Sequence, residues 1–126
     1  MNKVAFNDIG IGIDIENCDY FRRTRENYDK FNKIFTDFEK EYCLNMEEPY
    51  IHFCGRFAAK EAAIKALSSL GISNIPLNII EIRNTQQGVP QMQINDSKYQ
   101  NLSIKMSISH TKEQAVAIVI MLRVEK

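Results

Sequence analysis

The chain opens with an alternation of isoleucine and smaller or acidic residues. Isoleucine occupies every second position from 9 to 15, and the residues between and after are Gly10, Gly12, Asp14 and Glu16. This period of two predicts a half-buried strand. Its other face carries glycines, which have no side chain, and then acidic residues. Glycines inside a strand often mark a place where another backbone or a ligand needs room. We therefore expect buried isoleucines and a close neighbour on the glycine face.

Four further segments have the pattern of strands. "LNIIEIRN" (77–84) and "VPQMQI" (89–94) flank "TQQG", which predicts a strand, a turn and a second strand that Pro90 makes an edge or an irregular one. Residues 102–109 again alternate apolar with polar side chains. The run "AVAIVIMLRV" (115–124) is apolar on both faces, which predicts a central strand.

Between the first strand and these segments the pattern predicts helices of opposite charge. A polar helix is expected from residue 17 to about 33, and a second helix, capped at position 36 or 37, continues through residue 42. Five bases and two acids give residues 22–33 a net charge of +3, whereas one base and five acids give 37–48 a net charge of −4. These are two solvated helix faces, or the basic one is a landing surface for an acidic partner.

One long helix is predicted in the centre of the chain. Pro49 suits its first turn, the pattern continues to Leu70, and Gly71 is a stop signal. Five alanines between positions 58 and 66 fill one contiguous arc of this helix at 100° per residue. Such small side chains allow a neighbouring element to come close.

The same helix carries three charges where it is otherwise apolar, at Lys60, Glu61 and Lys65. Glu61 and Lys65 lie about 40° apart, and one interpretation is an exposed (i, i+4) ion pair worth about 0.3–0.5 kcal/mol. A solvated helix face usually carries more polar residues than this one does. The other interpretation is that both side chains are partly buried and need partners.

Composition limits the classes of function. The 126 residues fit a single domain over 1–126, and 44% hydrophobic and 25% charged residues are ordinary globular values. Basic and acidic residues number 16 each, so no net field attracts a polyanion and we expect no nucleic-acid partner. The N-terminus has no signal pattern and the longest apolar run is too short for a bilayer, so we expect a cytoplasmic protein without membrane contact.

The cysteines are three, at positions 18, 43 and 54, and form no CxxC pair. An odd number without that spacing predicts buried, inert thiols in a reducing compartment rather than disulfides. His52 and Cys54 alone are too few ligands for a zinc site.

Acidic residues on two separate elements favour a magnesium site. Asp14 and Glu61 would share one divalent cation if the first strand runs beside the long helix. Mg²⁺ binds few protein carboxylates and completes its shell with water and phosphate oxygens, so the site predicts a phosphate-bearing substrate. Lys65, with Arg56 and Lys60 nearby, would balance the substrate's charge. Taken alone, Asp14 is equally a turn residue at a strand end.

The segment "SISHTKE" places His110 where a strand gives way to a turn, with Thr111 directly after it. Serine, threonine and lysine around this histidine suit an anion, although a plain hydrogen-bonding role is the alternative. The residues by themselves thus predict a soluble α+β domain with a magnesium and phosphate site.

Three motifs in order resemble the holo-acyl carrier protein synthase family of phosphopantetheinyl transferases. They are "GIGIDIE", "GRFAAKEAAIKAL" and "SISHTKEQA", and the resemblance spans about residues 10–119. Its most specific part is F-x-x-K-E-x-x-x-K, at positions 57–65. The resemblance implies an α+β fold with a small antiparallel sheet around a long central helix. It also implies a homotrimer with active sites between subunits.

The family's activity implies a reaction for this chain. Members transfer 4′-phosphopantetheine from coenzyme A to a serine of an apo acyl carrier protein and release adenosine 3′,5′-bisphosphate. Asp14 and Glu61 would then hold Mg²⁺ on the pyrophosphate, and Lys65 would neutralise phosphate charge and help the leaving group depart. Phosphoryl transfer needs positioning and charge neutralisation more than a protein nucleophile.

The resemblance also implies contacts to the rest of coenzyme A. Arg56 and Lys60 would reach phosphates or subunit contacts, and His110 and Thr111 would meet the coenzyme phosphates. The loop that contains Gly88 and Pro90 would border the adenine. The base for the serine hydroxyl stays open between Glu61, acting through water, and His110.

The basic segment acquires a role in the same way. Carrier proteins present an acidic helix, and Arg22, Arg23 and Arg25 would meet it, which speeds encounter and sets orientation. Tyr20 stands where members commonly carry a base, and Gln87 where the adenine loop often has asparagine, so the choice of carrier stays open. A non-catalytic carrier-binding or nucleotide-binding module of the same fold is the alternative function, and a Mg²⁺ phosphohydrolase is a third.

Overall fold

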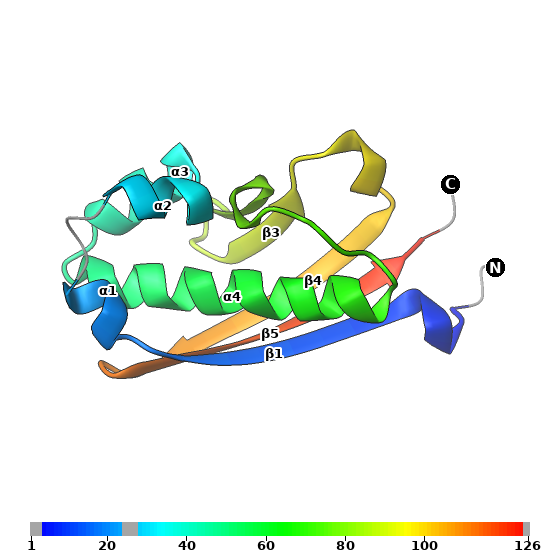
Figure 1. Cartoon of the computed structure of the whole chain (residues 1–126), viewed down its shortest axis with the longest axis horizontal. Coiled ribbons are helices and arrows are strands. Elements are labelled where there is room, and N and C mark those ends of the chain that lie inside the picture. The colour runs from blue at the N-terminus through cyan, green and yellow to red at the C-terminus, as the bar shows by residue number, and fades with distance from the viewer. Residues whose placement is uncertain (1–3, 24–27, 125–126) are drawn as a thin grey trace.

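The protein has the predicted α+β architecture in a computed structural model that describes residues 4–23 and 28–124. Helix α4 lies along one face of a small sheet, and the other α-helices gather at one end of the molecule (Figure 1). In chain order the elements are η1 (Phe6–Asp8), β1 (Ile9–Asn17), α1 (Asp19–Arg23), α2 (Tyr28–Ile34), α3 (Asp37–Leu44), α4 (Pro49–Ser69), η2 (Leu77–Ile79), β2 (Ile80–Asn84), β3 (Pro90–Ile94), η3 (Ser97–Tyr99), β4 (Leu102–His110) and β5 (Gln114–Arg123), where η marks a 3-10 helix.

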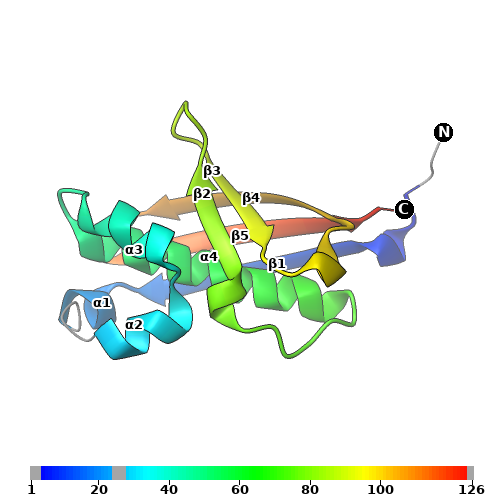
Figure 2. The same cartoon turned by 90° about the horizontal axis from the view of Figure 1, so that it is seen from above.

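Two antiparallel sheets form the β part. The larger sheet has the order β1-β5-β4, so the strand that is apolar on both faces is central, as predicted. Strands β2 and β3 form a separate hairpin that stands across α4 (Figure 2), and Pro90 is the first residue of β3. A proline in that position leaves the ladder intact because its missing N–H lies at the strand end.

Helix α4 begins and ends where the sequence indicates. Pro49 opens it, and Gly71 follows it with a φ of 81°, a conformation that favours glycine. The N–H of Ile72 donates to Leu67 O at 2.9 Å, which closes the last turn. The five alanines of the predicted arc are fully buried, so the helix backbone lies close to the sheet.

Strand β1 faces the opposite way from the expectation. A Cβ atom on Gly12 would lie 1.9 Å from Ala62 O, and one on Gly10 would lie 2.4 Å from Ala66 O, so the glycine face packs directly on α4. The isoleucines point outward, and between 40% and 62% of each is exposed. The expectation that they would be buried is wrong, because the close neighbour expected on the glycine face is the core helix itself.

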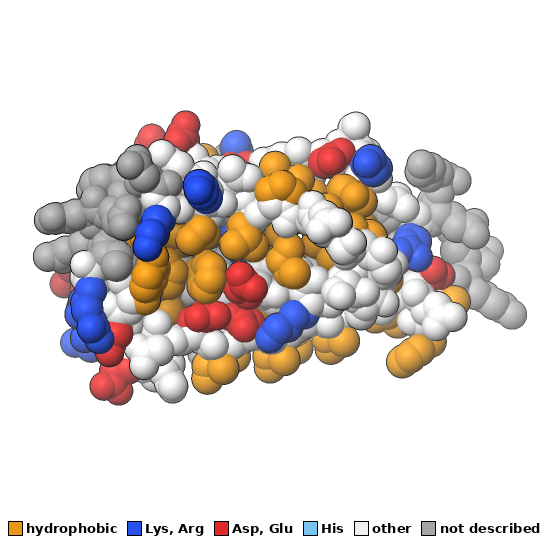
Figure 3. Space-filling view, in the orientation of Figure 1, with side chains coloured by type: hydrophobic (Ala, Val, Ile, Leu, Met, Phe, Trp, Pro, Cys, Tyr) orange, Lys and Arg blue, Asp and Glu red, His pale blue; other side chains and the backbone are white. Residues whose placement is uncertain are grey.

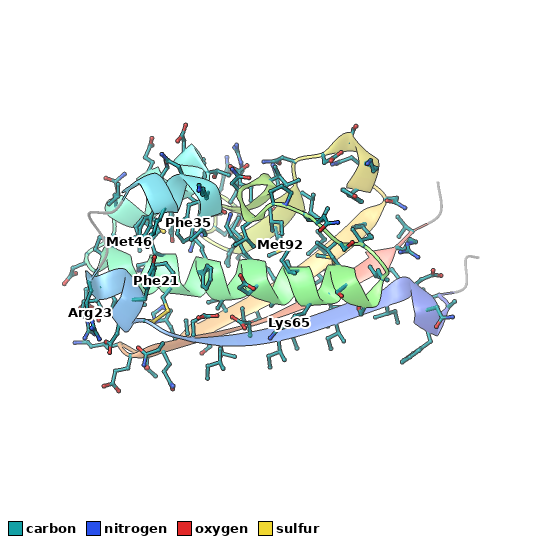
Figure 4. All side chains as sticks on the ribbon, viewed as in Figure 1. Phe21, Arg23, Phe35, Met46, Lys65 and Met92 are labelled. Atoms are coloured by element: carbon teal, nitrogen blue, oxygen red, sulfur yellow. A yellow bond between two sulfur atoms is a disulfide. The ribbon has the colours of Figure 1, made fainter. Side chains whose placement is uncertain are left out.

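The N-terminal helical region is divided into α1 and α2 rather than one helix from residue 17 to 33. Helix α3 has the expected cap, since Thr36 Oγ1 accepts from the N–H of Glu39 while the Glu39 side chain accepts from the N–H of Thr36. Phe21 and Phe35 belong to an aromatic cluster that fills the space between these helices and α4 (Figure 4).

The cysteine prediction is wrong for two of the three residues. Cys18 and Cys54 form a disulfide with a Cα separation of 5.4 Å, and only Cys43 is a free, buried thiol. Packing of β1 on α4 brings these two cysteines together, which their spacing of 36 residues does not reveal. Among the residues that the structure describes, no helix is long and apolar enough to cross a membrane.

Candidate active site

The order of contacts between β1 and α4 positions the acidic residues. Gly10 meets Ala66 and Gly12 meets Ala62, so the two elements run in opposite directions. Asp14 and then Glu16 follow on the same face of β1, because side chains alternate along a strand. They come next to the middle of α4, beside Glu61. Figure 3 shows acidic side chains grouped in the middle of this face with a basic group next to them.

Lys65 joins the helix to the strand. Its Nζ lies 3.2 Å from Asp14 Oδ1 and donates to Ile13 O at 2.9 Å. The label in Figure 4 places Lys65 on the side of α4 that faces β1. Glu61 has no ion pair within 4 Å among the described residues, so the exposed Glu61–Lys65 pair is not formed. Lys65 takes its partners on β1, as the second interpretation expects, but its side chain is 56% exposed, whereas Glu61 is partly buried.

Repulsion and burial raise the pKa values of two carboxyl groups here. The pKa of Glu61 is raised by burial and then by the charge of Asp14, while Lys65 opposes the shift. The pKa of Glu16 is raised to about 8 by burial, by its hydrogen bond with Asp14, and by the charges of Asp14 and Glu61. Sequence reasoning placed Glu16 on the acidic face but assigned it no role. Its position two residues after Asp14 was the available signal.

The chemistry of these oxygens fits a hard cation. Asp14 Oδ2 is buried and has no hydrogen-bond partner within the described residues. An unpaired buried carboxylate oxygen is costly, and either a proton on Glu16 or a cation would stabilise it. No three His, Cys, Asp or Glu side chains of the described segments form a metal-holding group. Two carboxylates completed by water and substrate oxygens are nevertheless the kind of set that Mg²⁺ uses.

A second polar cluster lies on the other side of α4. The ring centres of His52 and His110 are 5.8 Å apart, and His52 stands edge-on to Tyr42. The Arg56 guanidinium lies 4.2 Å from the centre of the Tyr42 ring and donates to Asn84 Oδ1 at 2.9 Å. Arg56 is buried and its Nε has no hydrogen-bond partner in the described residues.

The Arg56 guanidinium carries the permanent charge of this second cluster. The pKa of His52 is lowered by burial and then by the charges of Arg56 and His110, with Glu48 opposing them. Sequence reasoning gave His52 no part in this cluster. Thr111 is exposed beside His110, and its Oγ1 accepts from the N–H groups of Glu113 and Gln114. An anion bound here would accept hydrogen bonds from Arg56 Nε and from the imidazole N–H groups.

The hairpin loop lies near this second cluster. Gly88 has a φ of 84° in the turn between β2 and β3, and Asn84 Nδ2 donates to Gly88 O at 3.2 Å. Pro90 lines an open pocket of about 350 Å³ between β3 and β4. Asn84 therefore connects the loop to Arg56, which groups three of the expected coenzyme contacts at one end of the hairpin.

Lys60 does not fit the role expected for it. Its ammonium is fully buried and lies 2.7 Å from Glu39 Oε1. It also donates to Leu77 O at 3.0 Å and to Ile80 O at 2.5 Å. Because its donors are taken up inside the protein, Lys60 is not available to a phosphate or to another subunit. The helical pattern gave its position but not this partner.

The basic segment is only partly available to a partner. Arg22 donates to Tyr50 Oη at 2.9 Å and to Lys112 O at 3.2 Å, and it stacks on the Tyr50 ring. Arg23 is exposed and lines an open groove of about 480 Å³ with Asn17, Asp19 and Tyr20. Arg25 lies outside the described residues.

Comparison with known proteins places this geometry in a family. The model of the 4′-phosphopantetheinyl transferase superfamily matches residues 10–119. A holo-[acyl-carrier-protein] synthase of Chlamydia muridarum is 42% identical over 117 residues, covering 88% of this chain and 92% of that protein.

Solved structures agree with this match. The Bacillus anthracis holo-(acyl-carrier-protein) synthase in complex with CoA (3′,5′-ADP) has a TM-score of 0.69 and 32% identity, covering 90% of this chain and 95% of that one. The Helicobacter pylori holo-[acyl-carrier-protein] synthase in complex with coenzyme A has a TM-score of 0.74 and 28% identity, covering 88% and 98%. The chain therefore belongs to the 4′-phosphopantetheinyl transferase superfamily.

Proposed function

We propose that this protein, as a single domain, transfers 4′-phosphopantetheine from coenzyme A to a serine hydroxyl of an apo acyl carrier protein and releases adenosine 3′,5′-bisphosphate. The observation that carries the proposal is the meeting of Asp14, Glu61 and Lys65 between β1 and α4, in a chain of this superfamily. The relatives' names and the coenzyme A complexes of two similar structures support the same substrate pair.

Each residue of the first cluster has a part in this reaction. Asp14 and Glu61 would hold Mg²⁺, which when bound neutralises pyrophosphate charge and orients the leaving group. Lys65, held by Asp14 and Ile13 O but more than half exposed, can turn its ammonium toward a phosphate oxygen that bears developing charge. The attack of the serine oxygen on the β-phosphorus then needs only alignment and a proton acceptor.

Glu61, acting through a water molecule, is the proposed proton acceptor for the serine hydroxyl, because it lies beside Asp14 and Lys65, where the pyrophosphate would bind. His110, the other candidate, belongs to the cluster on the opposite side of α4. Within one chain it is separated from Asp14 and Lys65 by the helix.

This separation supports a homotrimer with active sites between subunits. Glu61 and His52 are nine positions apart, which is about 180° around a helix. A coenzyme bound between two copies of the chain would meet the Asp14 side of one copy and the His110 side of its neighbour. The exposed isoleucine face of β1, with Ile118 and Ile120 of β5, provides an apolar surface for such contact. It forms a row along the lower edge of Figure 3.

The carrier protein is proposed to dock at the groove beside α1. Arg23 is the exposed basic residue of this groove, and its charge would complement the acidic helix of a carrier. Arg22 contributes less, because its guanidinium already binds Tyr50 and Lys112 O. The cytoplasmic location stays a prediction, and the Cys18–Cys54 disulfide removes the cysteine argument for it.

A direct transfer assay tests the function. The protein is incubated with coenzyme A, Mg²⁺ and several apo carrier proteins, and the carriers are weighed by mass spectrometry. We expect the mass of one phosphopantetheine to be added to at least one carrier. Carrier binding without any transfer would favour the non-catalytic module, and coenzyme A cleavage without a carrier would favour the phosphohydrolase.

A further inference from the structure

A buried ion pair lies under the hairpin and takes no part in the proposed chemistry. Lys60 Nζ and Glu39 Oε1 are 2.7 Å apart, and both side chains are completely shielded from solvent. Burial lowers the pKa of Lys60, and the charge and hydrogen bond of Glu39 oppose that shift. Burying two charges is expensive, so such a pair is by itself weak evidence of stabilisation.

The pair connects two helices to the first strand of the hairpin. Lys60 donates to Leu77 O, in η2 just before the hairpin, and to Ile80 O, in the first residue of β2. Glu39 Oε2 accepts from the N–H of Ile82 at 2.7 Å, inside β2. Both ends of the pair thus hold backbone groups of the hairpin, and the capping box at Thr36 fixes the Glu39 side chain in turn.

One other directional contact with α4, the hydrogen bond from Arg56 to Asn84, lies at the loop end of β2. Within the described residues, no strand ladder joins β2 or β3 to the larger sheet. The hairpin packs through apolar side chains such as Ile80, Ile82 and Met92, and apolar packing is not directional. Figure 4 shows Met92 between the hairpin and α4. Directional bonds to backbone atoms therefore set where the hairpin lies along α4.

The far end of the same hairpin carries the proposed nucleotide contacts. Asn84 is the last residue of β2 and accepts from Arg56, Gly88 follows in the turn, and Pro90 begins β3. Arg56 is one helical turn before Lys60 on α4. A shift of the hairpin at Ile80 or Ile82 would move these groups relative to Arg56.

We propose that Glu39 and Lys60 are positioning residues for coenzyme A: the pair holds the β2–β3 hairpin in register on α4 and so keeps the loop and Asn84 in place for the nucleotide end. This inference rests on the proposed function. It assigns the pair no contact with the substrate and no part in proton transfer.

The test uses Lys60→Met together with Glu39→Gln, which removes both charges at nearly constant volume. Breaking only one partner of a buried pair would leave an uncompensated charge. Calorimetry measures binding of coenzyme A and of adenosine 3′,5′-bisphosphate, and the transfer assay gives kcat and the two KM values. Leu70→Ala serves as a control, because Leu70 is a core residue beside Gly10, away from the hairpin.

We expect the double variant to bind both nucleotides about tenfold more weakly or worse, with kcat and the carrier KM within about twofold of the unmodified protein. The Leu70→Ala control should lose thermal stability but keep nucleotide affinity. Unchanged nucleotide affinity in a folded double variant would overturn the inference. So would a loss for coenzyme A that is absent for adenosine 3′,5′-bisphosphate.

Two further results, an unfolded double variant and an unmodified protein that binds no nucleotide, can be distinguished from failure of the inference alone. If the double variant does not fold, Lys60→Arg keeps the charge but displaces its donors, and it should show the same selective loss of nucleotide affinity. Equal affinity in that variant would contradict the positioning role. If the unmodified protein binds neither nucleotide, the proposed function itself fails, and the inference fails with it.

Discussion

Lys65 Nζ and Asp14 Oδ1 lie 3.2 Å apart and join α4 to the glycine-rich strand β1. The lysine is more than half exposed while the aspartate is largely buried, so the pair presents an ammonium toward solvent above a carboxylate. Glu61 lies beside them without an ion pair of its own among the described residues. This arrangement leaves both carboxylates able to bind a cation without losing the lysine from the site.

Neutral substitutions of the two proposed metal ligands should abolish transfer without unfolding the protein. We expect Asp14→Asn and Glu61→Gln each to lower kcat/KM by about 100-fold or more. Mg²⁺ binding, measured by calorimetry, should weaken in both variants. Glu41→Gln, an exposed change on α3, is the matched control and should behave like the unmodified protein. Full activity in either site variant would exclude the metal site.

The raised pKa of Glu16 predicts a pH dependence of stability. Between its ordinary value of 4.5 and about 8, the folded protein keeps a proton that the unfolded chain has released. The free energy of unfolding should therefore fall as the pH rises through this interval. Glu16→Gln cannot ionise and should show a smaller fall in urea unfolding with EDTA present. Parallel profiles for the two proteins would be evidence against the shift.

The contact between β1 and α4 predicts a large effect of one methyl group. Gly12→Ala would place a Cβ atom 1.9 Å from Ala62 O, and neither backbone can yield without moving the site. We expect a loss of about 3 kcal/mol or more in unfolding free energy. Gly55→Ala is the control, because its Cβ meets only the Ile108 side chain at 3.1 Å. That change should stay within about 1 kcal/mol. Similar stability of both variants would refute the close packing.

Reduction of the Cys18–Cys54 disulfide should destabilise the protein. The bond closes a loop of 36 residues, which corresponds to about 3–4 kcal/mol on the chain-entropy account. Urea unfolding with and without a phosphine reductant measures this difference. The double variant Cys18→Ala with Cys54→Ala should start at the lower stability and ignore the reductant. An unmodified protein that is insensitive to reductant would show that the bond is not formed in solution.

A charge on the isoleucine face should separate the proposed trimer. Ile11 is 57% exposed and lies away from Asp14 and Lys65 on the outer side of β1. Light scattering should give the mass of three chains for the unmodified protein and of one chain for Ile11→Lys. Transfer activity should fall when the trimer separates, because the Asp14 cluster of one copy then no longer lies next to the His110 cluster of its neighbour. The control is Ser97→Lys, on the exposed surface of η3. A monomeric unmodified protein would contradict the proposal.

Local patterns were sufficient to predict most of the fold. Pro49 and Gly71 bound the long helix because each restricts the backbone conformation at its own position. The capping box at Thr36 and Glu39 likewise depends on neighbours within one turn. The central position of β5 followed from side chains that are apolar on both faces, which only a covered strand tolerates.

Contacts between distant segments were harder to predict. A period of two shows that β1 has two faces, but it does not show which of them meets α4. The preference for apolar burial favoured the isoleucines, whereas the need for close backbone packing selected the glycines. The pairing of Lys60 with Glu39 and that of Cys18 with Cys54 likewise depend on tertiary packing alone.

The packing of β1 on α4 also limits how this gene segment can evolve. Substitutions on the outer side of the strand leave its packing on α4 intact, but the loss or gain of one codon between Gly12 and Asp14 would reverse every later side chain of β1. The carboxylate would then turn away from Lys65, and an isoleucine would collide with the helix. Natural variants should therefore preserve the spacing of these two residues even where the isoleucines between and around them are replaced.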